Sequence, residues 1–132
     1  MSNKLVIGVT GMAGSGKSVI VSIATQRGYH VVAMGDEVRE EAKRRNLDYS
    51  PANLGRIMLE LRRIEGEAVI AKRCLQKIKM APREKVVVDG IRSLAEAEEF
   101  RREFGSFKLV AVHSSPETRF KRLHGRRRSD DS

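Results

Sequence analysis

The chain has 132 residues and a formal net charge of +9, from 26 Lys or Arg residues against 17 Asp or Glu residues. This length allows one domain, and the single cysteine, Cys74, excludes an internal disulfide bond. Without a secretory signal or a long apolar run, the sequence predicts a cytoplasmic protein that does not enter a membrane. The basic excess favours an anionic ligand, and the scarcity of aromatic residues disfavours nucleic acid without excluding it. The apolar neighbours of Cys74 predict a buried packing residue rather than a nucleophile.

The first predicted strand and helix flank a phosphate-binding motif. Residues 4–10 form a β-branched run typical of a strand, and apolar residues at helical spacing predict a helix over residues 18–26. The loop between them matches G-x-x-x-x-G-K-[ST] in full, with Gly11, Met12, Ala13, Gly14, Ser15, Gly16, Lys17 and Ser18. A strand before the loop and a helix after it distinguish this motif from a chance glycine-rich turn.

The positions of this loop predict a binding site for ATP and Mg²⁺. Glycine lets backbone N–H groups turn inward around phosphate oxygens. Lys17 is expected to contact the β- and γ-phosphates as a catalytic residue. The Ser18 hydroxyl is expected to ligate Mg²⁺.

A strand over residues 29–33 and a helix over residues 35–45 are predicted next. Asp36 and Arg39 lie three positions apart at the start of this helix, so they share one face. In one interpretation Arg39 clamps the phosphate of an acceptor and Asp36 is a polar group near the metal. In the other, Asp36 stabilises the helix dipole and Arg39 is a surface charge. The sequence leaves both interpretations open.

Two further helices are predicted before the third strand. One begins at Pro51, with Ser50 as its capping residue, and the other covers residues 67–78. Charges of mixed sign on most of the helices are typical of solvated faces. A parallel crossover needs one helix, so the segment between the second and third strands has room for two more than the connection requires.

The third predicted strand, over residues 85–88, ends at Asp89. An acidic residue after a valine run is typical of a Walker-B position, so Asp89 is predicted to hold Mg²⁺ with Ser18, directly or through water. Gly90 permits a tight turn, and Arg92 is expected to enter the cleft. The alternative is a structural Asp in the first turn of the helix that the pattern predicts over residues 93–104.

The last predicted elements are a strand over residues 107–112, a helix over residues 116–123 and a basic cluster. Arg126 and Arg128 are predicted to close over the triphosphate from a short lid, the alternative being a disordered basic tail. The alternation of strands and helices predicts an α/β fold of three α/β/α layers around a parallel sheet.

Together these motifs resemble the adenylate-kinase branch of the nucleoside monophosphate kinases. The segments that match are MGDEVR at residues 34–39, DGIR at 89–92 and GRRRSDD at 125–131. Met34 stands where that family has Thr, and the second segment lacks the family's proline. The resemblance implies a single P-loop kinase domain over residues 1–132. Within it, residues 35–80 form a helical acceptor-binding insertion and residues 124–132 begin a lid.

The resemblance also implies roles for individual residues. Lys17, Asp89, Arg126 and Arg128 act in catalysis, and Asp36, Arg39 and Arg92 bind the acceptor. A closer resemblance is to an archaeal group of uncharacterised P-loop proteins described as adenylate-kinase-related or dephospho-CoA-kinase-like. Members of both families continue past the lid, so we expect that a C-terminal strand and helices are missing from this chain.

The predicted function is phosphoryl transfer from ATP to a small phosphorylated acceptor such as a nucleoside monophosphate or dephospho-CoA. The alternative is an ATP-binding regulator without transferase activity, which switches the helices between residues 51 and 79 for a protein or RNA partner. A nucleic-acid kinase is a third possibility, indicated by net charge alone.

Overall fold

The computed structural model describes residues 4–11 and 16–113. Within them are four strands and five helices, and three of the helices follow one another between the second and third strands. The strands are β1 (Leu5–Thr10), β2 (His30–Ala33), β3 (Lys85–Asp89) and β4 (Lys108–Ala111). The helices are α1 (Lys17–Gln26), α2 (Gly35–Arg44), α3 (Pro51–Glu65), α4 (Val69–Lys79) and α5 (Leu94–Glu103). The predicted helix over residues 116–123, the predicted lid, and Arg126 and Arg128 lie outside the described residues.

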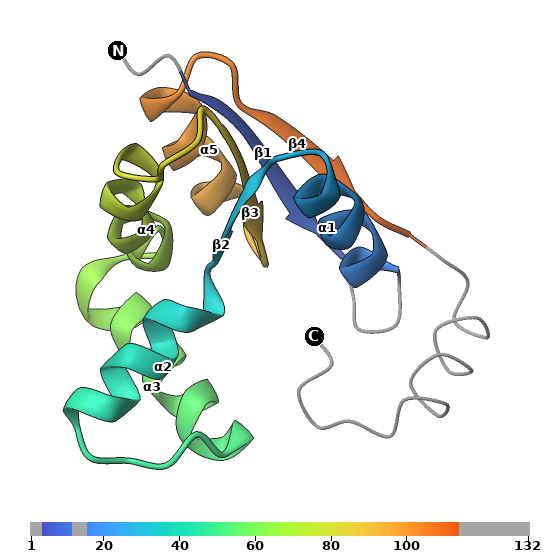
Figure 1. The fold of residues 1–132 in the computed structure, drawn as a ribbon. Helices are drawn as coiled ribbons and strands as arrows, with labels where there is room; N and C mark the ends of the chain where they lie inside the picture. The colour runs from blue at the N-terminus through green and yellow to red at the C-terminus, as the bar shows by residue number, and fades with distance from the viewer. Residues whose placement is uncertain (1–3, 12–15, 114–132) are drawn as a thin grey trace.

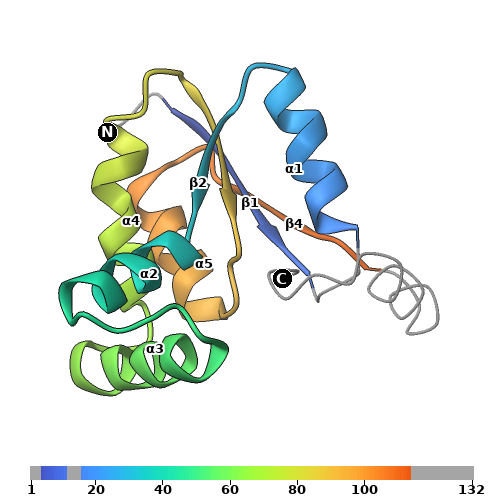
Figure 2. The same ribbon diagram turned by 60° about the horizontal axis from the view of Figure 1, so that its bottom comes forward.

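The strands form one parallel sheet in the order β2-β3-β1-β4. Helix α1 covers one face, and α4 and α5 pack against each other on the opposite face (Figures 1 and 2). The central strands β1 and β3 are buried on both faces, which explains their nearly continuous apolar runs. The predicted three-layer α/β/α fold is confirmed.

Helices α2 and α3 lie beyond the carboxyl ends of the strands (Figure 1). They belong to the same core as the sheet, because Val38 of α2 and Ile57 and Leu61 of α3 join its buried cluster. Ser50 caps α3 as predicted, its hydroxyl accepting a hydrogen bond from the Asn53 N–H at 3.2 Å. Helices α2 and α3 therefore cover the edge of the sheet at which its strands end. We call these two helices the roof.

Cys74 of α4 is fully buried in this core. Burial raises the pKa of its thiol to about 12, so the thiol stays protonated and unreactive at neutral pH. The prediction of a packing residue is confirmed.

No helix among the described residues combines the length and the apolar character needed to span a membrane.

An ion-pair network joins the three helices between β2 and β3. Glu41 of α2 accepts hydrogen bonds from Arg44, Arg45 and Arg73, and Arg73 reaches it from α4 at 2.9 Å. Arg45 also contacts Glu60 of α3 at 3.2 Å. These three guanidinium groups lower the pKa of Glu41 from 4.5 to about 2.

Gly8 provides a test of packing in the sheet. A Cβ atom at this position would lie 2.2 Å from Ile91 Cδ1 and 2.8 Å from Phe107 Cζ. Gly8→Ala should therefore lower the free energy of unfolding by about 1–3 kcal/mol, because the Phe107 ring must move within a closely packed core. Denaturant unfolding of both proteins measures the difference, and equal midpoints would contradict this packing.

Glu41 provides a test of the network through pH. Its folded-state pKa of about 2 lies below its ordinary value of 4.5, so its stabilising contribution is complete above pH 4.5 and lost as pH falls toward 2. Glu41→Gln should flatten the dependence of unfolding free energy on pH between about 5 and about 2.5. The matched control is Glu98→Gln, which changes an exposed residue of α5. It should leave the slope of unfolding free energy against pH unchanged. The same slope in all three proteins would refute the assignment.

Candidate functional site

Asp89 lies at the middle of the sheet's carboxyl edge. It pairs in register with Val9 of β1 on one side and with Ala33 of β2 on the other. The Met34 N–H donates to the Asp89 carbonyl at 2.9 Å, and the Gly90 N–H donates to the Val9 carbonyl at 3.1 Å. Gly90 has a φ of +103°, which favours glycine at this turn. Both neighbouring strands therefore fix the backbone that presents the Asp89 carboxylate.

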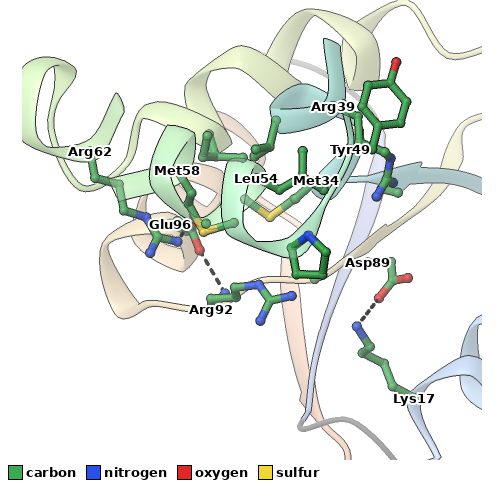
Figure 3. A pocket seen from close by; sticks show the side chains of 17 residues that line it. Lys17, Met34, Arg39, Tyr49, Leu54, Met58, Arg62, Asp89, Arg92 and Glu96 are labelled. Carbon is green, nitrogen blue, oxygen red and sulfur yellow. Dashed lines mark hydrogen bonds and ion pairs between the residues drawn. The ribbon is translucent and has the colours of Figure 1, made fainter. Parts of the chain in front are cut away.

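Lys17 faces Asp89 from the first turn of α1 (Figure 3). Its Nζ lies 3.0 Å from Asp89 Oδ1, and the residue is only 5% exposed. Gly16 precedes the helix with a φ of +104°, and no acidic residue occupies the first turn of α1. The ammonium group and the positive end of the α1 dipole therefore lie together at the carboxyl edge, an arrangement suited to an anionic ligand.

A cavity of about 520 Å³ begins at this ion pair and continues beneath α2 and α3. Its apolar wall includes Met34, Val38, Leu54, Met58 and Ile70. Its basic groups are Lys17, Arg39, Arg62 and Arg92, and its acidic groups are Asp89 and Glu96. Such a space can hold a molecule with an apolar middle and anionic ends.

The structure brings three of the predicted acceptor and catalytic residues to this cavity with Lys17, namely Asp89, Arg39 and Arg92. Asp36 lies on a different hollow, with His30 and Lys77, although it forms an ion pair with Arg39. The Arg39 and Asp36 side chains are 42% and 54% exposed, so this ion pair adds little stability. An anion of higher charge, such as a phosphate, can therefore displace Asp36 from Arg39.

Arg62 and Glu96 also line the cavity, although no motif in the sequence predicted them as site residues. Glu96 is only 1% exposed and closes a capping box with Ser93, a spacing visible in the sequence as S-x-x-E. Arg62 follows Leu54 and Met58 at four-residue spacing on α3. Only the packing of α3 beyond the carboxyl ends of the strands brings Arg62 to the cavity.

The donor set at the carboxyl edge fits Mg²⁺ that arrives with a nucleotide. The described residues contain no group of three or more His, Cys, Asp or Glu side chains suited to hold a metal ion. Asp89 and Ser18, which follows Lys17 in α1, supply a carboxylate and a hydroxyl. Magnesium sites of this kind take one or two protein oxygens and complete the shell with phosphates and water.

Gly55 provides a test of the cavity wall. It lies inside α3 and lines the cavity, and a Cβ atom there would meet nothing within 4 Å. Gly55→Ala should therefore raise the free energy of unfolding by about 0.5–1 kcal/mol through helix propensity alone, the opposite sign to Gly8→Ala. Denaturant unfolding measures it, and a destabilised protein would mean that the wall is closed at this position.

Comparison with known proteins places the chain in a family. A family model described as an AAA domain matches residues 7–132. A UPF0200 protein of Methanothrix thermoacetophila is 50% identical over 127 residues, which are 96% of this chain and 69% of that protein. A UPF0200 protein of Hyperthermus butylicus is 47% identical, covering 98% of this chain and 69% of its own length. A UPF0200/UPF0201 protein of Archaeoglobus fulgidus is 49% identical, and the chain spans 40% of it.

Two solved structures share the fold. TT1252 from Thermus thermophilus aligns with a TM-score of 0.59 at 18% identity, covering 93% of this chain and 72% of that one. A gluconokinase from Sinorhizobium meliloti 1021 aligns with a TM-score of 0.52 at 22% identity, covering 96% of this chain and 67% of that one. At these identities the likeness concerns the fold. Sequence and fold together show that the chain belongs to the archaeal UPF0200 family and contains an AAA domain with a P-loop kinase-like fold.

Proposed function

We propose that the protein is an ATP- and Mg²⁺-dependent phosphotransferase that acts on a small nucleotide-like acceptor. The observation that supports this most is the Lys17–Asp89 ion pair at one end of a cavity that continues to Arg39 and Arg92. A site for a triphosphate alone needs no second group of cations beyond the phosphate-binding loop.

The donor half of the site is the loop over residues 11–18. Its backbone N–H groups and Lys17 would hold the β- and γ-phosphates of ATP. When bound, Mg²⁺ would lie at Ser18 and Asp89 and offset charge on the phosphate oxygens. In this arrangement Asp89 holds the Lys17 side chain at the carboxyl edge before the nucleotide arrives.

The acceptor half of the site lies under α2 and α3. Arg39 and Arg92 would hold the acceptor's phosphate, because guanidinium groups bind phosphate oxygens in pairs. The apolar wall of Met34, Leu54 and Met58 would cover the acceptor's ring system.

The transfer itself needs little proton chemistry from the protein. For a nucleoside monophosphate, an oxygen of the acceptor's phosphate attacks the γ-phosphorus, the bond to the β–γ bridging oxygen breaks, and ADP leaves with that electron pair. Lys17 stabilises charge on the transferred group, and we propose that Arg126 and Arg128 do so from the lid.

One observation favours the alternative of an ATP-binding regulator. Met34 lines the cavity directly after β2 and is 2% exposed, and its thioether cannot donate a hydrogen bond to a phosphate. A regulator would bind ATP and change the position of α3 for a protein or RNA partner without using an acceptor.

Lys17→Ala tests the donor half. Loss of the ammonium group should lower acceptor-stimulated conversion of ATP to ADP about 100-fold or more, with the fold retained. The matched control is Lys72→Ala on the exposed side of α4, which should keep the wild-type rate. The assay uses a panel of nucleoside monophosphates and dephospho-CoA.

Each outcome of this assay separates the two candidates. Turnover by Lys17→Ala at the wild-type rate would contradict the assignment of the loop. Tight ATP binding by the wild-type protein, with no acceptor on the panel stimulating turnover, would reject the phosphotransferase and favour the regulator.

A further inference from the structure

Helix α3 has two faces with different tasks. Ile57 and Leu61 are buried in the core. Leu54, Met58 and Arg62, spaced four residues apart, line the cavity. The cavity face is therefore apolar for two turns and then ends in a guanidinium group.

Arg62 has hydrogen-bonding capacity that the described residues do not use. Its Nη2 lies 3.4 Å from Glu96 Oε2, the outer limit of a hydrogen bond. Its Nε is buried and has no hydrogen-bond partner among the described residues. An arginine carries five N–H donors, and a buried donor without a partner costs free energy unless a ligand or water satisfies it. The side chain is 19% exposed, through the cavity that it lines.

Glu96 holds Arg62 in this place. Glu96 Oε1 accepts hydrogen bonds from the backbone N–H groups of Arg92 at 2.8 Å and Ser93 at 3.1 Å. These bonds anchor the carboxylate to the start of α5, so its second oxygen faces Arg62 from a fixed position. One buried carboxylate therefore sets the positions of the Arg62 guanidinium and of the Arg92 backbone.

Arg62 and Lys17 lie at opposite ends of the cavity (Figure 3). Met58, Leu54 and Arg92 lie between them. An acceptor that turns its phosphate toward Arg92 and Lys17 would extend its other end toward Arg62.

We propose that Arg62 is a specificity-determining residue that contacts the end of the acceptor remote from its phosphate, with Glu96 as its positioning residue. This inference rests on the proposed function. A guanidinium group only donates hydrogen bonds, so the group that it recognises carries accepting atoms, such as the carbonyl oxygens or ring nitrogens of a nucleobase. The acceptor class is a phosphorylated molecule with a flat apolar body and a remote accepting edge.

The test compares a complete acceptor with one that lacks the remote end. Equilibrium binding of the four ribonucleoside monophosphates and of ribose 5-phosphate is measured for the wild-type protein and for Arg62→Met. We expect the tightest nucleoside monophosphate to lose about 10-fold or more in affinity, as expected for a good bidentate contact, and ribose 5-phosphate to stay within about twofold. The matched control is Arg63→Met, which removes the same charge from the exposed side of α3 and should change neither affinity.

Two further variants separate contact from structure. Arg62→Lys keeps a cation beside Glu96 but loses the planar donor group, so it should show the same selective loss even if Arg62→Met does not fold. Glu96→Gln keeps an oxygen for the N–H groups of Arg92 and Ser93 and loses the charge facing Arg62. It should raise the KM for the nucleoside monophosphate and leave kcat unchanged.

Several results would overturn the inference. Equal losses for the nucleoside monophosphate and ribose 5-phosphate would show that Arg62 acts on the phosphate or on the fold. Unchanged affinities in Arg62→Met and Arg62→Lys would show no contact. Failure of the proposed function has a different signature, since selective loss of binding without any ADP formation by the wild-type protein would reject phosphoryl transfer and retain the role of Arg62.

Discussion

The position of β3 between β1 and β2 is the constraint on which the site depends. Because β3 pairs in parallel with both strands, Asp89 lies beside the carboxyl end of β1 and beside the turn that begins α2. Lys17 therefore forms its ion pair with a residue whose backbone is paired with a neighbouring strand on each side. A shift of one residue in either pairing would turn the Asp89 side chain to the other face of the sheet and leave Lys17 buried without its partner.

The roof over this edge depends on a different kind of interaction. Helices α2, α3 and α4 share apolar core contacts, and the Glu41 network joins them on their polar side. These two kinds of contact hold α3 beyond the strand ends, while one face of α3 lines the cavity. A parallel crossover needs only one helix, so the additional helices serve to build this cavity. The two halves of the proposed site, for the donor and for the acceptor, are thus built by different parts of the fold, namely the sheet edge and the roof.

Much of this arrangement was predictable because its signals are local. The Gly16–Lys17 start of α1, the valine run before Asp89 and the Ser50–Pro51 start of α3 each specify structure within a few residues. Asp36 shows the limit of prediction from local sequence. Residues three apart on a helix differ by about 60° in direction. That difference is enough to turn Asp36 toward another hollow while Arg39 lines the cavity. Arg62 was not predictable, since its burial depends on where α3 packs and not on its neighbours in sequence.

Cys74 has a consequence for how the protein can be observed. It is the only cysteine of the chain and lies fully buried in α4, at the junction of the sheet and the roof. Its thiol can react with a labelling reagent only when α4 separates from the core, so the labelling rate reports the frequency of that opening. The chain thus contains a natural reporter of local unfolding, and a ligand that bridges the sheet edge and the roof would slow it.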